Sequence, residues 1–180
     1  GEAEQYRHGR WGEESAVDAL RLALDGRWTL FRSIEWPDRK WGDVDLVLVG
    51  PGGVWAIEVK AYSIRVKNVG DRWERRGRGG WHRLARDPGR QARRNAVQLK
   101  EHLNKHGVAV AYVKPAIIWA GEPDLLTVRD PATPVWTLVE LEEKSDLLWY
   151  GQGLSDVEMR RAVEVLRQMV GTATEKPPKE

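Results

Sequence analysis

Apolar residues recur at helical spacing in three segments of the chain, and the stretches between them have the shorter patterns of strands. The helical segments are residues 11–26, 87–107 and 154–170. The middle one has Asp87 as an N-cap and Pro88 at the first helical position, and the last is capped by Ser155 or Asp156. The middle helix should bury one apolar stripe, formed by Ala92, Ala96, Leu99 and Leu103.

Shorter apolar runs, several of them bounded by Gly or Pro, predict strands. They are residues 27–34, a hairpin at 42–60, a second and more polar hairpin at 62–76, and runs at 108–121 and 133–143. We expect the fourth to be interrupted or bent at Pro115, residues 36–42 to form a turn or loop, and residues 77–82 to be a flexible connector. This order predicts a mixed sheet flanked by helices, of the α/β or α+β class.

The hairpin at 42–60 carries charges inside apolar runs. If residues 50–53 form its loop, Val49 lies opposite Val54, and the same register places Asp45 opposite Glu58. Because side chains alternate along a strand, Asp45, Glu58 and Lys60 share one face, together with Asp43, Val47, Val49, Val54 and Ala56. The other face should hold Val44, Leu46, Leu48, Trp55, Ile57 and Val59.

Opposed carboxylates at Asp45 and Glu58 repel each other and lose hydration when they are buried, so they should shift their pKa values or bind a cation. Mg²⁺ is commonly held by one or two carboxylates, water and substrate phosphate. Lys60 projects to the same side, where it can orient a water or neutralise a phosphoryl oxygen. The alternative is a solvated strand edge on which Lys60 only pairs with one of the two acids.

Charge is unevenly distributed along the chain. Residues 65–94 carry 11 basic and three acidic groups, and all but one of the basic groups are arginine, which suits phosphate. This segment indicates a polyanionic partner or, alternatively, a solvated arginine-rich surface. Trp73 and Trp81 lie among these arginines and either stack on bases or pack on the core.

The composition limits which side chains could bind a metal and indicates where in the cell the protein is expected. The chain has no cysteine and only four scattered histidines, which leaves oxygen ligands as the donors for a metal. No apolar run reaches the length of about 20 residues needed to span a membrane, and no signal peptide is apparent, so we expect a cytoplasmic protein without a membrane partner. The length suits one domain at residues 1–170, followed by a polar tail or linker at 171–180.

Several motifs together resemble a known family. Asp45, followed after twelve residues by Glu58-Val59-Lys60, resembles the core of the PD-(D/E)xK nuclease superfamily. Three further motifs resemble those of one family in this superfamily, the nuclease-related domain (NERD) family. They are Gly9-x-x-Gly12-Glu13, the sequence of the 42–60 hairpin, and Asp87-Pro88-x-x-Gln91 followed by Asn95. The pair Ala61-Tyr62 departs from the polar residue usual in that family after the lysine.

This resemblance implies a restriction-endonuclease-like αβββαβ core. It further implies that Asp45 and Glu58, with the Val59 carbonyl, bind Mg²⁺ or Mn²⁺, that Lys60 is the catalytic lysine, and that Glu13 and Gln91 support the metal or the attacking water. The function expected is metal-dependent hydrolysis of phosphodiester bonds, with DNA as the first candidate substrate. Phosphate contacts are expected from the arginine-rich segment and the helix after it, at Arg72, Arg75, Arg76, Arg78, Arg90, Arg93 and Arg94.

Two other functions fit the same sequence. One is a non-catalytic nucleic-acid-binding module that retains the nuclease fold. The other is a protein-interaction domain that uses the acidic region 120–180 as its contact surface. Metal-dependent cleavage separates the first from a nuclease, and binding to nucleic acid at low salt separates the second.

Overall fold

A five-stranded mixed sheet forms the centre of the protein, seen in a computed structural model that describes residues 2–36, 42–149, 151 and 153–170, with side chains from residue 9 onward. Its strands, in spatial order, are β1 (Thr29–Ile34), β2 (Val44–Gly50), β3 (Gly53–Lys60), β7 (Val113–Trp119) and β9 (Val135–Thr137). The first three pair antiparallel, and β3, β7 and β9 run parallel. The predicted α/β class and mixed sheet are confirmed.

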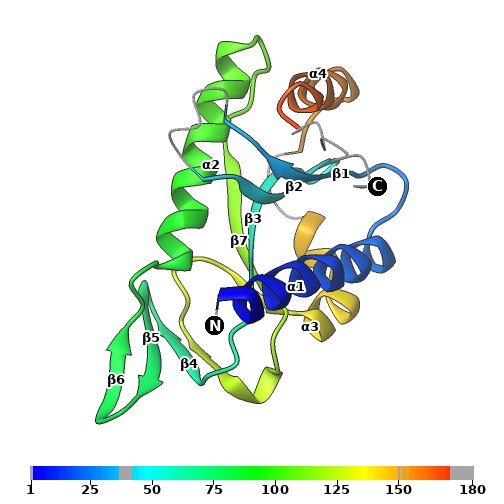
Figure 1. Cartoon of the computed structure of the whole chain (residues 1–180). Coiled ribbons are helices and arrows are strands. Elements are labelled where there is room, and N and C mark those ends of the chain that lie inside the picture. The colour runs from blue at the N-terminus through cyan, green and yellow to red at the C-terminus, as the bar shows by residue number, and fades with distance from the viewer. Residues whose placement is uncertain (1, 37–41, 150, 152, 171–180) are drawn as a thin grey trace, which may run out of the picture.

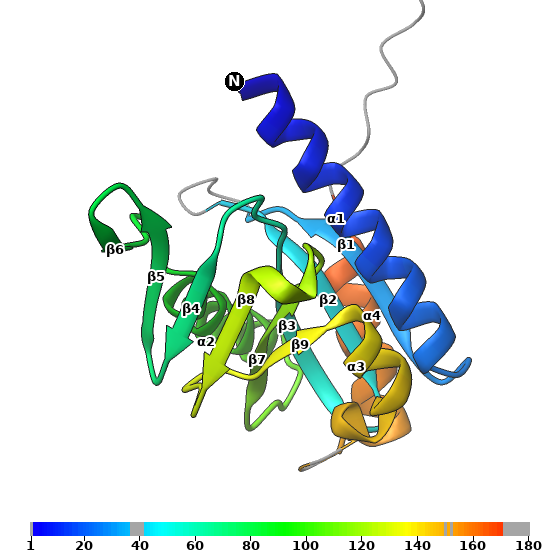
Figure 2. The same cartoon turned by 90° about the horizontal axis from the view of Figure 1, so that it is seen from below.

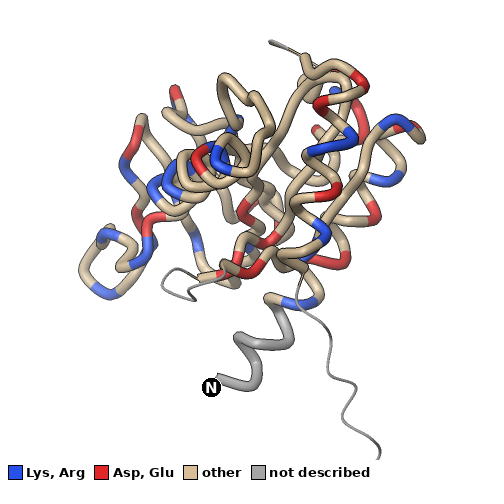
Figure 3. Tube along the Cα trace, turned by 90° about the horizontal axis from the view of Figure 1, so that it is seen from above, with Lys and Arg blue, Asp and Glu red and all other residues tan. Residues whose placement is uncertain are grey.

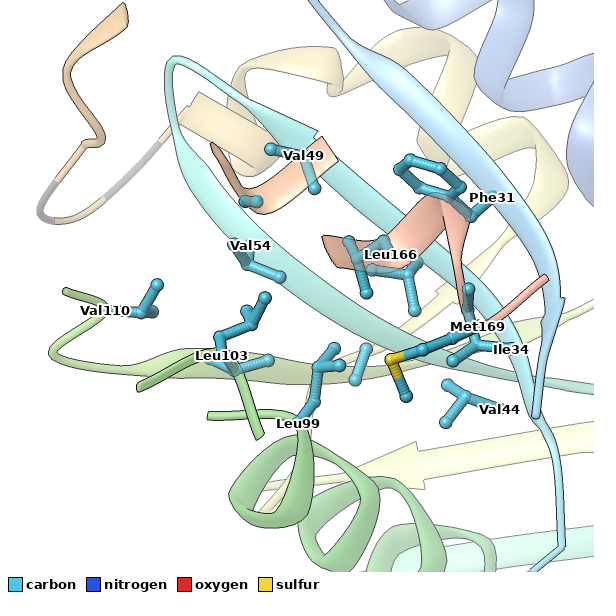
Figure 4. Close-up of a cluster of buried hydrophobic side chains, with 14 of the residues drawn as sticks. Phe31, Ile34, Val44, Val49, Val54, Leu99, Leu103, Val110, Leu166 and Met169 are labelled. Carbon is cyan, nitrogen blue, oxygen red and sulfur yellow. The ribbon is translucent and has the colours of Figure 1, made fainter. Parts of the chain in front are cut away.

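Helices cover both faces of this sheet (Figures 1 and 2). They are α1 (Glu2–Ala23), α2 (Pro88–Lys105), α3 (Leu138–Glu143) and α4 (Asp156–Arg167), joined by short 3-10 turns at Pro123–Leu125 and Ser145–Trp149. Helices α1 and α3 pack on one face, and α2 and α4 on the other. The buried side chains between the sheet and the α2–α4 layer are drawn in Figure 4.

The helix-end chemistry follows the sequence. Asp87 caps α2 and accepts a hydrogen bond from the Arg90 amide, with Pro88 at the first position. Ser155, rather than Asp156, caps α4, in a reciprocal capping box with Glu158. All four residues of the predicted α2 stripe are buried. Helix α1 begins earlier than the predicted residue 11.

A second, smaller sheet lies beside the N-terminal end of α2 (Figure 1). Its strands, in order, are β6 (Gly80–Arg83), β5 (Arg72–Gly77), β4 (Val66–Val69) and β8 (Leu126–Arg129). The predicted hairpin at 62–76 is confirmed as β4 and β5, but the predicted flexible connector at 77–82 is wrong. Gly77 pairs with Gly80, and a two-residue turn with positive φ at Gly79 folds β6 back onto β5.

The register of the β2–β3 hairpin is as predicted. Val49 pairs with Val54, and Gly50 pairs with Gly53 across a Pro51-Gly52 turn. The expected face of Val44 is wrong, because Val44 packs with Val47 and Val49 in the α2–α4 layer (Figure 4). The break in alternation falls beside Ser33 on β1, whose φ of 51° interrupts the regular strand. Asp45 lies at this irregular level of the sheet.

Two later segments differ in part from the expectation. Pro115 lies within β7 without ending it. Backbone nitrogens two residues apart on a strand point to the same side, and the Ile117 amide donates to the Pro134 carbonyl on the β9 side, so the Pro115 nitrogen faces that side too. At Pro115 no strand pairs on that side, since the β7–β9 ladder begins at Ile117. The expected strand at 133–143 is three residues of β9 followed by α3, which Thr137 caps.

Two predictions fall on residues outside the described ranges. These are most of the loop at 36–42 and the tail at 171–180. Among the helices of the described chain, none combines the length and the apolar character needed to cross a bilayer.

Candidate active site

The end of β3 brings together the charged groups that the sequence singled out. Glu58 is 1% exposed and lies between the sheet and α2, where the Asn95 amide donates a hydrogen bond of 2.8 Å to Glu58 Oε1. Lys60 Nζ lies 3.6 Å from the other oxygen, Glu58 Oε2. Both oxygens of one buried carboxylate are thus held, one by a neutral amide and one by an ammonium group.

Asp45 faces the same end of β3 from the neighbouring strand. Its Oδ2 accepts a hydrogen bond of 2.8 Å from the Val59 amide. The regular β2–β3 ladder stops one step earlier, at Leu46 and Ile57, so the Val59 amide bonds to this side-chain carboxylate instead of to a backbone carbonyl of β2. The arrangement fixes Asp45 in the plane of the sheet, next to the residue that follows Glu58.

The two carboxyl groups have raised pKa values. Burial, then the negative charge of Asp45, raises the pKa of Glu58 to about 8, and Lys60 opposes this. Burial also raises the pKa of Asp45, against the lowering effects of the Val59 amide and Lys60. Two anions that are desolvated together, with one lysine to balance them, leave an excess of negative charge when both ionise.

The donors at this point suit a hard divalent cation. Asp45 and Glu58 supply carboxylate oxygens, and the raised pKa values mean that an added positive charge would be favourable. The Val59 carbonyl should point to the β2 side, as the Val59 amide does, whereas the Lys60 carbonyl is bonded to the Ala120 amide on the β7 side. Within the described residues no group of three or more His, Cys, Asp or Glu side chains forms a metal cluster, so the carboxylate contribution is this pair.

Glu13 approaches the pair from α1. It is half-buried, and its pKa is raised by burial and then by the charge of Asp45, while Arg32 and Lys60 oppose the rise. Gly12 permits this approach, because a Cβ there would lie 3.2 Å from Ala61 Cβ, just beyond Lys60. The predicted Gly-x-x-Gly-Glu motif therefore brings a third acid near the site through close helix–strand packing.

Gln91 and Asn95 occupy successive turns of α2. The structure joins Asn95, not Gln91, to Glu58 by a hydrogen bond, and Gln91 is half-buried one turn nearer the N-cap. Sequence reasoning noted Asn95 within a motif but gave it no role. Its signal was a polar residue next to the apolar stripe of the helix, at a position that proves to be buried.

The predicted phosphate-contacting arginines are not equivalent. Arg72 pairs with Glu74 at 3.1 Å, and Arg93 donates to the Thr133 hydroxyl at 2.7 Å. Arg72 is nevertheless exposed, as are the other predicted contacts, which are Arg75, Arg76, Arg78, Arg90 and Arg94. Figure 3 shows Lys and Arg segments along the projecting β5–β6 hairpin. The small sheet and α2 therefore carry exposed basic side chains.

The two tryptophans of this region also differ. Trp73 is 3% exposed and packs with Val66 and Trp119, so of its two predicted environments the core is the observed one. Trp81 is partly exposed, with Lys67 Nζ 4.5 Å from its ring centroid. Cationic groups already occupy the surroundings of Trp81, since Arg76 also lies 5.8 Å from the ring.

Comparison with known proteins adds one finding to this geometry. No curated protein and no solved structure gives a match to the chain. Residues 8–120 match the sequence profile of the NERD family, described as the nuclease-related domain. The matched segment runs from α1 through β7 and includes Glu13, Asp45, Glu58, Lys60 and Asn95. With this match over more than half of its length, the chain belongs to the nuclease-related domain family.

Proposed function

We propose that this nuclease-related domain hydrolyses phosphodiester bonds in nucleic acid, with DNA as the first candidate and Mg²⁺ or Mn²⁺ as the metal. The observation that carries the proposal is the pair formed by the buried Glu58 and the partly buried Asp45, both with raised pKa values, with Lys60 Nζ 3.6 Å from Glu58 Oε2. Such a pair is costly in a metal-free protein, and the combination of two acids and a lysine suits catalysis at a phosphate.

Asp45, Glu58 and the Val59 carbonyl are the groups that would hold the metal. A divalent cation held by such oxygen ligands polarises a phosphoryl oxygen and lowers the pKa of a water molecule. The Asn95 amide fixes the Glu58 carboxylate, so that its orientation does not depend on the metal. The Val59 amide does the same for Asp45.

Lys60 and Glu13 would act on the substrate and the attacking water. The Lys60 ammonium is partly exposed and can contact a phosphoryl oxygen, where it would stabilise charge that develops in the transition state. Glu13, half-buried near Asp45 and Lys60, can accept a hydrogen bond from water on the α1 side. Gln91 would hold water or phosphate near the first turn of α2.

The exposed arginines would hold the nucleic-acid backbone. Arg75, Arg76 and Arg78 lie on or beside the β5–β6 hairpin, and Arg90 and Arg94 lie on α2. Contacts of this kind fix position rather than sequence, and they weaken as salt rises. Arg72 is paired with Glu74 and Arg93 is bonded to Thr133, so a phosphate contact from either would compete with that interaction.

Cleavage assays on plasmid and single-stranded DNA, with Mg²⁺, Mn²⁺ or EDTA, test the proposal. Wild type should cleave only with metal, and Lys60→Ala should lower the rate on the order of 100-fold or more because it removes charge stabilisation at the phosphate. Lys105→Ala is the matched control, since Lys105 is exposed at the far end of α2.

The outcomes distinguish the alternatives. Salt-sensitive binding without cleavage by wild type would favour a non-catalytic nucleic-acid-binding module. Absence of binding at low salt would favour a protein-interaction domain. Equal cleavage by wild type and Lys60→Ala would contradict the assigned site.

A further inference from the structure

A pocket of about 540 Å³ opens beside the proposed active site, where α1 meets the segment after β3. Its volume is within the range of about 300–1,000 Å³ typical of small-ligand sites. Its lining residues carry two aromatic rings, apolar surface, two hydroxyl groups and one carboxylate, and they include Trp11, Ala61, Tyr62, Ser63, Glu122 and Leu125.

Trp11 is the unusual member of this pocket. Its side chain is 57% exposed, whereas six other tryptophans are buried, namely Trp28, Trp36, Trp55, Trp73, Trp119 and Trp136. The exposed indole adds a free aromatic face to the wall of the pocket, on which a planar ligand can stack. The adjacent Gly12 packs on Ala61, which fixes Trp11 beside the opposite wall.

The opposite wall is held in place by the core. Tyr62 packs against Trp119, with ring centroids 5.9 Å apart. Trp119 Nε1 in turn donates a 3.0 Å hydrogen bond to the Glu122 carbonyl. Tyr62 and Glu122 are therefore positioned by one buried indole, so the pocket is formed before any ligand enters.

The pocket lies beside the proposed catalytic residues, because Gly12, between Trp11 and Glu13, packs on Ala61 and Val59, which flank Lys60. Trp11 lies two residues before Glu13, and Tyr62 lies two residues after Lys60. A nucleic-acid strand whose phosphate contacts Lys60 would therefore bring a neighbouring base to the aromatic residues of the pocket.

The polar groups of the pocket suit a base rather than a phosphate. The Glu122 carboxylate would repel a phosphate but can accept a hydrogen bond from the amino group of a base. The Ser63 hydroxyl can donate or accept. Aromatic residues stack on any base, which gives affinity without strong sequence preference.

We propose that this pocket binds an unstacked nucleobase next to the scissile phosphate, so that the substrate is single-stranded or locally unpaired nucleic acid. The inference rests on the proposed nuclease function and specifies its substrate class. In a duplex both faces of a base are stacked, and entry to the pocket would require extrusion of the nucleotide. The stacking residue proposed here, Trp11, lies outside the arginine-rich segment that contains Trp73 and Trp81.

Fluorescence anisotropy tests this, with single strands of about 15 nucleotides and a duplex of the same length at low salt in EDTA, so that binding is read without cleavage. Trp11→Ala should weaken single-strand binding on the order of 10-fold and leave duplex binding unchanged. Trp11→Phe should retain most of the affinity. Tyr112→Ala is the control, because Tyr112 is 63% exposed and does not line this pocket.

A second readout uses a strand that contains 2-aminopurine, whose fluorescence is quenched by stacking. Wild type should quench it and Trp11→Ala should not. Equal losses on single strand and duplex, or no loss on either, would overturn the pocket. If the protein cleaves with metal but Trp11→Ala binds as well as wild type, only the proposed base-binding pocket is wrong. If binding depends on Trp11 but no cleavage occurs, only the proposed hydrolysis is wrong. Absence of all binding would overturn both.

Discussion

Each of the two sheets contains one buried glutamate, and the two glutamates differ in the charged groups that surround them. Glu74 in the small sheet pairs with Lys67 at 3.4 Å and with Arg72 at 3.1 Å. Glu58 in the central sheet has one lysine at 3.6 Å, and Asp45 adds a second anion beside it. The first carboxylate is compensated within the protein. The second shares one lysine with Asp45, so without metal it keeps its proton near neutral pH, and an external cation could balance the pair when both carboxyl groups ionise.

The largest expected effect comes from removing each charge. Glu58→Gln keeps the shape but removes a metal-binding oxygen anion, so metal-dependent cleavage should fall on the order of 100-fold or more. Glu74→Gln should leave cleavage unchanged but destabilise the protein by about 1–3 kcal/mol, because Lys67 and Arg72 lose their common partner. Cleavage rates and urea unfolding measure both. If both variants lost cleavage equally, the proposed difference in role between Glu58 and Glu74 would be wrong.

The pH dependence of stability tests the excess charge directly. Without metal, the pKa of Glu58 is about 8 in the folded protein and near 4.5 when unfolded. Between these values the unfolded chain releases a proton that the folded chain keeps, so the free energy of unfolding falls as pH rises, on the order of 2–4 kcal/mol. Urea unfolding in EDTA at several pH values should show this in wild type and in Glu74→Gln. The fall should be much smaller in Glu58→Gln, where only the raised pKa values of Asp45 and Glu13 contribute to it, and the same slope there would contradict the assignment.

A buried asparagine accompanies each sheet, Asn95 on α2 against the central sheet and Asn68 on β4 of the small sheet, and the two provide a smaller test. Asn95 donates to Glu58, whereas Asn68 donates to the backbone carbonyls of Gly70 and Arg72. Asn95→Ala should lower metal affinity or cleavage by about 10- to 100-fold, as loss of an outer-shell partner does. Asn68→Ala should reduce thermal stability and leave metal affinity intact. Mn²⁺ titration and thermal unfolding separate the two effects, and a purely structural role of Asn95 would leave the Mn²⁺ affinity unmoved.

The smallest expected effect concerns how α1 packs at the end of β3. A Cβ at Gly12 would lie 3.2 Å from Ala61 Cβ, while one at Gly9 would meet open space. Gly12→Ala should shift α1 slightly with Glu13 and slow cleavage about two- to fivefold, because small displacements of catalytic groups cost rate. Gly9→Ala should leave cleavage unchanged and stabilise the helix by up to about 1 kcal/mol. Equal rates in both variants would show that the position of Glu13 is unimportant.

The core hairpin was predictable because its local rules agree. The Pro51-Gly52 turn and the apolar alternation specify one register, which placed Asp45 beside Glu58 correctly. The face of Val44 was not predictable, because it depends on the positive φ of Ser33 on another strand. Alternation within one strand carries no information about irregularity in its neighbour.

Two other features could not be predicted from the sequence, for a different reason. They are the contact between Asn95 and Glu58 and the complete small sheet. Asn95 is 37 residues from Glu58 in the chain, and only the packing of α2 on β3 joins them. Strand β6 has four residues, of which Arg83 and His82 are exposed, so it offers no apolar pattern. Contacts made by tertiary packing, and strands held by pairing alone, leave little trace in local periodicity.

Diffraction from crystals soaked in Mn²⁺ tests the central claim most directly. Anomalous density should appear between the Asp45 and Glu58 carboxylates, next to the Val59 carbonyl, and should disappear in Glu58→Gln but not in Glu74→Gln. A Mn²⁺-soaked crystal without density there, in which Lys60 still pairs with Glu58, would contradict the account.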